Sequence, residues 1–172
     1  IAFSAPYVAE LVRQEMVNRY GENAYDDGYQ VYTTITRKLQ VGAQVALRNN
    51  IIAYDMRHGY RGPQQVLWKA HEPALPTAEI VEKLKKQPGY GPFIPAAVTG
   101  VTTDNATALL ANGDTITLPM SGIRWARAYR SDTAQGPTPR SVLDVLQVGQ
   151  QIWVRNLDDS WWLGQIPDVN SA

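Results

Sequence analysis

Hydrophobic residues in the first third of the chain recur at helical spacing. Their intervals of three and four predict a helix over residues 7–20, which Gly21 ends, and a longer helix over residues 37–57 with Thr36 as its cap. The β-branched and aromatic run at residues 30–35, between the two helices, predicts a strand. The expected apolar face of the first helix comprises Val8, Leu11, Val12, Met16 and Tyr20, and that of the second comprises Leu39, Ala43, Ala46, Leu47, Ile51 and Tyr54.

Beyond residue 64 the pattern changes to short strand-like runs separated by turns. The predicted strands are 65–69, 97–101, 106–110, 115–118, 123–129, 151–156 and 160–166, with a short helix after Thr77 and a helical turn at 142–146. Asn112-Gly113 is the strongest hairpin signal, and Asp158-Asp159 is expected to turn the last strand pair. Short antiparallel strands at this density, within about 110 residues, predict a small OB-like barrel, with a β-sandwich as the alternative. The expected fold class is mostly β with flanking helices (α+β), an antiparallel OB-like barrel plus an N-terminal helical linker.

Charge and cysteine content narrow the classes of function. The 172 residues carry 16 Lys and Arg against 16 Asp and Glu, so we expect no nucleic-acid partner, because phosphate binding needs an excess of clustered cations. With no Cys and 2 His, the chain lacks the residues for a disulfide scaffold, a thiol nucleophile, an iron–sulfur centre or a three-His metal site. We therefore expect no cofactor and no metal.

The chain also lacks a predicted membrane span. No stretch approaches the roughly 20 apolar residues that a membrane helix needs, and no basic segment precedes an apolar one as in a signal peptide. We therefore expect no membrane contact by these residues. The chain begins at Ile1 rather than Met and stops at Ala172, and we expect it to be a piece of a longer protein.

Motifs for acyl transfer are missing. No Ser is followed three residues later by Lys, and neither Lys-Thr-Gly nor Gly-x-Ser-x-Gly occurs. We interpret His58 and His71, which lie beside turns, as surface or capping residues. The pairs Asp26-Asp27 and Asp158-Asp159 are expected to form turns rather than to act as glycosidase carboxylates. We predict no catalytic residue in this chain.

Interleaved arginines and aromatic rings at residues 124–130 form the strongest candidate binding segment. This pattern is typical of a surface for single-stranded nucleic acid, glycan or protein; the alternative is that Trp125 belongs to the core with the arginines lying over the barrel wall. Trp161 and Trp162 are consecutive in a predicted hairpin, so alternation places them on opposite faces, one buried and one exposed. The candidate partner-binding residues are Arg124, Trp125, Arg127, Tyr129, Arg130, Trp161 and Trp162.

Several strings resemble a known family. Residues 5–13 (APYVAELVR), 19–21 (RYG) and 31–35 (VYTTI), with Leu39-Gln40, resemble the linker between the glycosyltransferase and transpeptidase domains of class A penicillin-binding proteins. Residues 53–63 (AYDMRHGYRGP) resemble the 1a branch of that family in Gram-negative bacteria, and 125–127 (WAR), 148–149 (VG) and 165–167 (QIP) fit the same branch. The resemblance covers essentially the whole chain. Gly42 departs from it, because an alanine-rich helix would be expected there.

The resemblance implies a role for each part of the chain. Residues 1–60 would be the interdomain linker leading toward the transpeptidase, residues 61–169 an OB-like docking domain, and residues 170–172 the start of the return to the transpeptidase. The parent enzyme would polymerise and crosslink peptidoglycan on the periplasmic side of the bacterial inner membrane. The implied partners are the parent's own glycosyltransferase and transpeptidase domains and an outer-membrane lipoprotein that activates the synthase. Direct binding of peptidoglycan glycan and a purely structural spacer are the alternative functions.

Overall fold

The structure, a computed structural model, describes residues 5–168 and divides into two compact units at residues 48 and 49. Residues 170–172, expected to begin the return to a following domain, lie outside the described residues. No helix within the described range is long and apolar enough to cross a membrane.

The first unit consists of a helix, a 3-10 helix, a segment without regular secondary structure and the start of a second helix, with no buried side chain among its described residues. Helix α1 (Pro6–Tyr20) confirms the predicted first helix, with Pro6 in the first turn where its missing N–H is harmless, and a 3-10 helix η1 (Gly21–Tyr25) follows. Its expected apolar face does not pack, since α1 has no buried residue. The Arg13 guanidinium instead pairs with Glu10 at 2.7 Å and donates to the Tyr25 hydroxyl at 3.0 Å.

The strand predicted at residues 30–35 is wrong. These residues have no regular secondary structure, and residues 29–34 are all exposed. A strand is stable only when another strand accepts its hydrogen bonds, and no strand among the described residues pairs with this segment. Among the described residues, these β-branched residues therefore have no neighbouring strand with which to form a sheet.

Helix α2 (Arg37–Arg57) has the predicted bounds, and the Thr36 hydroxyl accepts a hydrogen bond from the Leu39 N–H at 3.4 Å. It is unbroken at Gly42. Its expected apolar face is largely exposed, and its buried residues are Ile52 and Asp55, both near its C-terminal end. Ile52 packs in a small cluster with Phe93 and Trp153, so the C-terminal end of α2 is part of the second unit.

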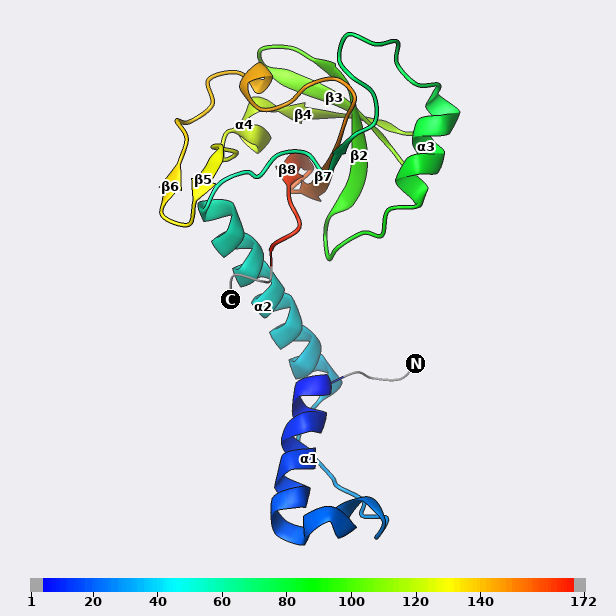
Figure 1. The fold of residues 1–172 in the computed structure, drawn as a ribbon, viewed down its shortest axis with the longest axis vertical. Coiled ribbons are helices and arrows are strands. Elements are labelled where there is room, and N and C mark those ends of the chain that lie inside the picture. Colours follow the sequence, from blue (N-terminus) through cyan, green and yellow to red (C-terminus); the bar gives the residue numbers. More distant parts are fainter. Residues whose placement is uncertain (1–4, 169–172) are drawn as a thin grey trace. The chain divides into compact units, whose positions relative to one another are not determined.

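An antiparallel sheet organises the second unit (Figure 1). Its strands are β1 (Gln65–Val66), β2 (Ile94–Val101), β3 (Asn105–Leu110), β4 (Thr115–Pro119), β7 (Gln150–Leu157) and β8 (Ser160–Gly164). They follow the order β1-β7-β2-β3-β4, and β8 pairs with β7. The Asn112-Gly113 turn between β3 and β4 confirms the predicted hairpin, with Gly113 at φ +90°. Asp158 and Asp159 turn β7 into β8 at φ 50° and 57°.

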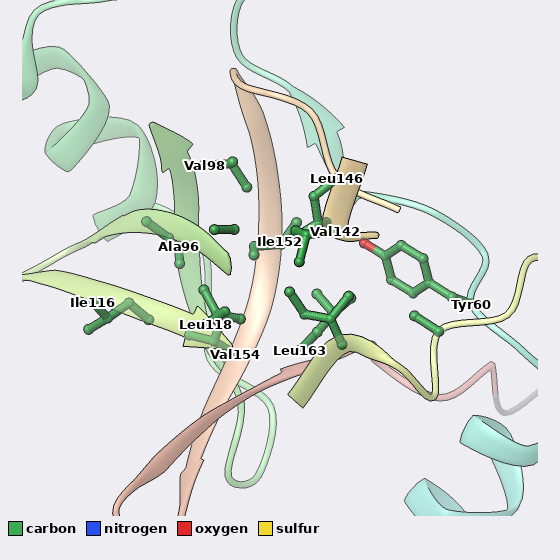
Figure 2. Packing of buried hydrophobic residues seen from close by; sticks show 14 of the residues in the cluster. Tyr60, Ala96, Val98, Ile116, Leu118, Val142, Leu146, Ile152, Val154 and Leu163 are labelled. Carbon is green, nitrogen blue, oxygen red and sulfur yellow. The ribbon is translucent and has the colours of Figure 1, made fainter. Parts of the chain in front are cut away.

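Alternate strand residues bury two hydrophobic cores on opposite faces of the sheet. Even-numbered residues Ala96 and Val98 of β2 and Ile152 and Val154 of β7 face the main core, together with residues of β3, β4 and β8 (Figure 2). Ala97 of β2 faces the second core, which helix α3 (Thr77–Lys85) covers.

The sheet is OB-like but open, which refines the predicted closed barrel. Among the described residues β4 and β8 share no hydrogen-bonded ladder, and the short helix α4 (Met120–Ile123) packs on β8 instead. Pro119 ends β4 and lacks an N–H to continue a ladder. Gly122 of α4 lies so close to β8 that an added Cβ would be 2.4 Å from the Trp161 carbonyl oxygen. Helix α4 therefore occupies the position beside β8 where a closed barrel would have a paired strand.

The strand predicted at residues 123–129 is therefore also wrong. Ile123 ends α4 and is fully buried, Arg124 is its C-cap, and only Tyr129–Ser131 forms a strand, β5. β5 pairs with β6 (Ala134–Gln135) in a separate two-stranded sheet. The predicted helical turn at 142–146 is the 3-10 helix η2 (Val142–Asp144).

Candidate partner-binding site

The candidate segment 124–130 leaves α4 as a compact turn whose side chains point in different directions. Trp125 turns inward: its indole Nε1–H donates to the Leu163 carbonyl oxygen at 2.9 Å, and its ring meets the Tyr60 ring edge-to-face at 5.9 Å between centroids. It packs against the main core while remaining partly exposed. The indole thus packs at the edge of the core rather than standing free on the surface.

The side chain of Arg127 is half-buried and is held by a hydrogen bond within the protein. Its guanidinium Nε–H donates to the Gly136 carbonyl oxygen at 2.7 Å, which ties the loop after β6 back to the segment. Its own carbonyl accepts from the Tyr60 N–H at 2.7 Å, and the Tyr129 N–H donates back to the Tyr60 carbonyl at 2.9 Å. Arg127 thus holds the segment in place, and we assign its side chain a structural role.

Tyr60 lies at the centre of this arrangement. It is 7% exposed, and Figure 2 shows its ring beside Val142 at the edge of the main core. Its hydroxyl has no hydrogen-bond partner among the described residues, and burial raises its pKa. The hydroxyl therefore stays neutral at physiological pH.

Three of the candidates are left on the surface. Arg124 and Arg130 are exposed, and Tyr129 is 38% exposed. The Tyr129 hydroxyl donates to Asp132 Oδ1 at 2.8 Å, and that carboxylate raises the pKa of the phenol. The hydrogen bond fixes the ring orientation, so Tyr129 presents a rigid aromatic face.

Beside Tyr129 lies an open groove of about 830 Å³. Its lining includes two small residues, the buried Ala126 and the exposed Ala128, with the partly buried Val145. The run Pro137–Arg140 lines it as well. The complete lining is Tyr60, Arg61, Gly62, Ala126, Ala128, Tyr129, Pro137, Thr138, Pro139, Arg140, Asp144 and Val145.

A capping box holds the Arg140 end of this run. The Asp144 carboxylate accepts from the backbone N–H groups of Arg140 and Ser141 at 2.9 and 3.0 Å, while the Ser141 hydroxyl accepts from Leu143 N–H. The two backbone N–H donors lower the pKa of Asp144. Asp144 is therefore ionised at neutral pH, and its charge is already engaged by the backbone.

A polar hub beside the groove joins the end of α2 to the segment after β8. Asp55 is 8% exposed, and it accepts from Arg61 Nη1 at 2.7 Å, from Arg61 Nη2 at 3.1 Å and from Gln165 Nε2 at 2.7 Å. Gln165 also donates to the Gly59 carbonyl at 2.8 Å, and the Asp168 N–H reaches Asp55 at 3.4 Å. The end of α2 is thereby joined to the segment after β8.

Trp161 and Trp162 lie on opposite faces of β8, as predicted. Trp161 packs against the main core, and Trp162 is the cross-strand neighbour of Arg155. Both rings are partly buried, so the expectation that one would be exposed is wrong. The physical reason is that both faces of β8 are covered. The main core covers one face. Phe93 covers the other, and its ring lies so close that it occupies the space a Gly164 Cβ would need.

The groove thus gathers only part of what the sequence singled out. Tyr129 lines it, and Arg124 lines an adjoining cavity of about 470 Å³ that shares Pro137, Pro139 and Arg140 with it. Sequence reasoning missed Arg61 and the Pro-Thr-Pro-Arg run. The signal was present: two prolines directly before a capping box indicate a rigid wall. Among residues 5–168, no group of three or more His, Asp or Glu is placed to hold a metal ion.

Comparisons with known proteins give one matching family and several similar proteins. The family described as "Penicillin-binding protein OB-like domain" matches residues 60–169. Penicillin-binding protein 1A of Escherichia coli (strain K12) is 65% identical over 172 residues, which is all of this chain and 20% of that protein. Penicillin-binding protein 1A of Vibrio cholerae is 43% identical over 178 residues, covering 100% of this chain and 22% of that protein.

A solved structure extends the likeness to the fold. The crystal structure of penicillin-binding protein 1A from Haemophilus influenzae superposes with a TM-score of 0.62 at 47% identity, covering 96% of this chain and 23% of that chain. The chain therefore spans about a fifth of the length of the relatives it matches.

Proposed function

The chain belongs to the penicillin-binding protein OB-like domain family, and from that premise we propose that it is the non-catalytic docking module of a bifunctional peptidoglycan synthase. The observation that carries the proposal is the groove. The same segment that the sequence marks for binding supplies Tyr129 to its lining, and the groove volume of about 830 Å³ falls in the range of ligand sites.

The proposed partner is an outer-membrane lipoprotein that activates the synthase. The parent protein would carry a glycosyltransferase and a serine-type transpeptidase outside these residues, and would work on the periplasmic side of the inner membrane. The docking module would regulate cell-wall synthesis allosterically: lipoprotein binding would favour the active conformation of the transpeptidase. An exposed, hydrogen-bonded tyrosine beside exposed arginines is the composition of an interface hot spot, which supports a protein partner.

The proposed arrangement in the parent makes residues 61–169 an insert and residues 1–60 the linker that leads to it. An insert must enter and leave its host at neighbouring points. The polar hub supports this requirement, because the Gln165 amide donates directly to Asp55 across 110 residues of sequence. In this proposal the second unit would meet its host through one joint.

The proposal is tested by calorimetry on the full 172-residue chain with the periplasmic domain of the lipoprotein from the same organism. Binding is expected, and Tyr129→Ala should weaken it by about 1–3 kcal/mol if the ring is a hot spot. Lys86→Ala, at the C-cap of α3 on another part of the unit, is the matched control and should bind as the parent chain does. No heat at high micromolar concentrations of both proteins would contradict the docking function.

Glycan binding is the second candidate, and the exposed Tyr129 ring is the observation that favours it. Sugar rings stack on flat aromatic faces, but Trp125, the larger platform, is turned into the core. Sedimentation with insoluble murein sacculi separates the two functions. The docking function predicts little retention, and strong retention that Tyr129→Ala abolishes would favour glycan binding.

A further inference from the structure

We infer that the groove beside β5 binds an extended peptide segment whose carboxylates lie at its Arg124–Arg140 end. The inference rests on the proposed docking function, of which it names the contact and the chemistry of the partner. Three properties carry it: the small residues in the lining, the rigidity of the wall and the two arginines outside any ion pair at one end.

The lining admits a polypeptide backbone. Ala126 and Ala128 carry single methyl groups and Gly62 carries none, so a ligand main chain can lie close to the protein. The groove is open along its length rather than enclosed, which fits a continuous chain better than a compact small molecule. Tyr129 stands at the edge with its ring held by Asp132, and it offers an apolar face to a side chain of the ligand.

The wall is set in place before the ligand arrives. Pro137 and Pro139 fix their own φ angles, and the Asp144 carboxylate holds the Arg140 and Ser141 N–H groups. Gly136 at the other end is tied to Arg127. A preorganised wall loses little conformational entropy on binding, which favours affinity for a flexible peptide.

Charge decides which peptide fits. The Arg124 and Arg140 side chains are exposed, both line the adjoining cavity of about 470 Å³, and neither forms an ion pair with any residue the structure describes. Arg61 lines the groove too, but Asp55 neutralises it at 2.7 Å. The one carboxylate in the lining, Asp144, accepts from two backbone N–H groups and also attracts the Arg140 guanidinium over a longer distance than an ion pair. Both guanidinium groups are thus outside any ion pair, and each can form charge-assisted hydrogen bonds with a ligand carboxylate.

A peptide is favoured over a nucleic acid because the positive charge is confined to this end. The chain as a whole has equal numbers of acidic and basic residues, and the groove lining itself contains the Asp144 carboxylate. A phosphate backbone lying along the groove would meet that carboxylate with repulsion. A peptide can place acidic residues at one end and neutral residues along the rest.

The test uses the full 172-residue chain and a blocked hexapeptide of alternating glutamate and alanine. In an extended chain, alternate side chains lie on one side about 7 Å apart, so two carboxylates can face the two arginines. Titration followed by ¹H–¹⁵N correlation spectra should shift the amides of Ala126, Tyr129 and Arg140. The peptide with glutamine in place of glutamate is the matched ligand control and should bind at least about tenfold more weakly.

Variants test the assigned residues. Arg124→Gln with Arg140→Gln should abolish the preference for glutamate over glutamine, whereas Lys86→Gln should leave it unchanged. Raising the salt concentration should reduce affinity for the glutamate peptide alone, because salt screens exposed charges. Equal binding of the two peptides, shifts confined to another face, or an unchanged preference in the double variant would each overturn the inference.

The same double variant separates this inference from the docking function. If the lipoprotein domain binds the parent chain and the double variant equally well, the docking function stands and the groove is not its contact. If the glutamate peptide binds as described but the lipoprotein domain does not, the groove stands and the docking function fails.

Discussion

Gly149 offers the sharpest test of how the second unit is assembled. It precedes β7 at φ +90°, and a Cβ added there would lie 1.9 Å from the Trp68 carbonyl oxygen. Gly113 in the β3–β4 hairpin has the same φ of +90°, but nothing lies within 4 Å of its added Cβ. Alanine at the two positions therefore meets the same backbone strain, and only Gly149→Ala adds a steric clash.

The expected losses follow from these contacts. A non-glycine residue at positive φ costs about 1–2 kcal/mol, and the lower entropy of the unfolded alanine chain offsets part of this. Gly113→Ala should therefore lose about 1 kcal/mol of unfolding free energy. Gly149→Ala must also displace backbone that forms the hydrogen bonds Leu67 N–H to Gly149 O (2.7 Å) and Gly149 N–H to Val98 O (2.8 Å), each worth about 1 kcal/mol. Movement of Trp68 out of the second core adds to this, for a total of about 4 kcal/mol.

Urea denaturation followed by tryptophan fluorescence measures the difference. All 5 Trp residues lie in the second unit, so the fluorescence change reports that unit and not residues 5–48. Gly149→Ala should shift the midpoint at least twice as far as Gly113→Ala, with the same slope. Equal shifts for the two variants would refute the argument that the approach of Trp68 requires glycine.

Three further predictions concern polar contacts. Asp55→Asn should lower the unfolding free energy by about 2–3 kcal/mol in the same assay, because its amide would face the donors of Arg61 and Gln165; a loss below about 0.5 kcal/mol would contradict the role of the hub. Folding lowers the pKa of the Asp144 carboxyl below its ordinary value. The stability that ionised Asp144 contributes is therefore fully present when the pH is above the unfolded-state pKa. It is lost as the pH falls through the lower folded-state pKa. Asp144→Asn should therefore flatten the acid limb of the urea midpoint between pH 5 and pH 2, measured as a series, and an unchanged limb would argue against the capping box. Trp125→Phe should lower the unfolding free energy by about 1–3 kcal/mol, because it removes the hydrogen bond to the Leu163 carbonyl oxygen. A thermal unfolding midpoint equal to that of the parent chain would contradict this prediction.

Local sequence signals predicted the elements that local interactions decide. Helix α2 has its predicted bounds because helical spacing, the Thr36 cap and the glycines after Arg57 act within a few residues of one another. The β3–β4 hairpin was equally predictable, since Asn112-Gly113 accepts the positive φ that a tight turn needs. The resemblance to class A penicillin-binding proteins was also readable at this level, and the family match at residues 60–169 agrees with it.

Elements that depend on distant partners were predicted poorly. Residues 30–35 have strand composition but no strand to pair with among the described residues. Residues 123–129 also have strand composition, but α4 and the inward Trp125 occupy that stretch, because Gly122 packs against β8 and the indole bonds to Leu163. Composition ranks conformations for a short segment, and the packing of segments far apart in sequence selects among them.

The sequence by itself therefore determined the longer helices and the hairpins at Asn112-Gly113 and Asp158-Asp159, and it indicated the segment at residues 124–130 as a candidate for binding. Only the tertiary structure decided which of those residues are available. It turned Trp125 and Arg127 inward, left Arg124 and Tyr129 outside, and brought Arg140 beside them from a different loop. The physical reason is that a binding surface is defined by what remains unpaired after the core and the backbone hydrogen bonds are satisfied, and that remainder is a property of the whole fold.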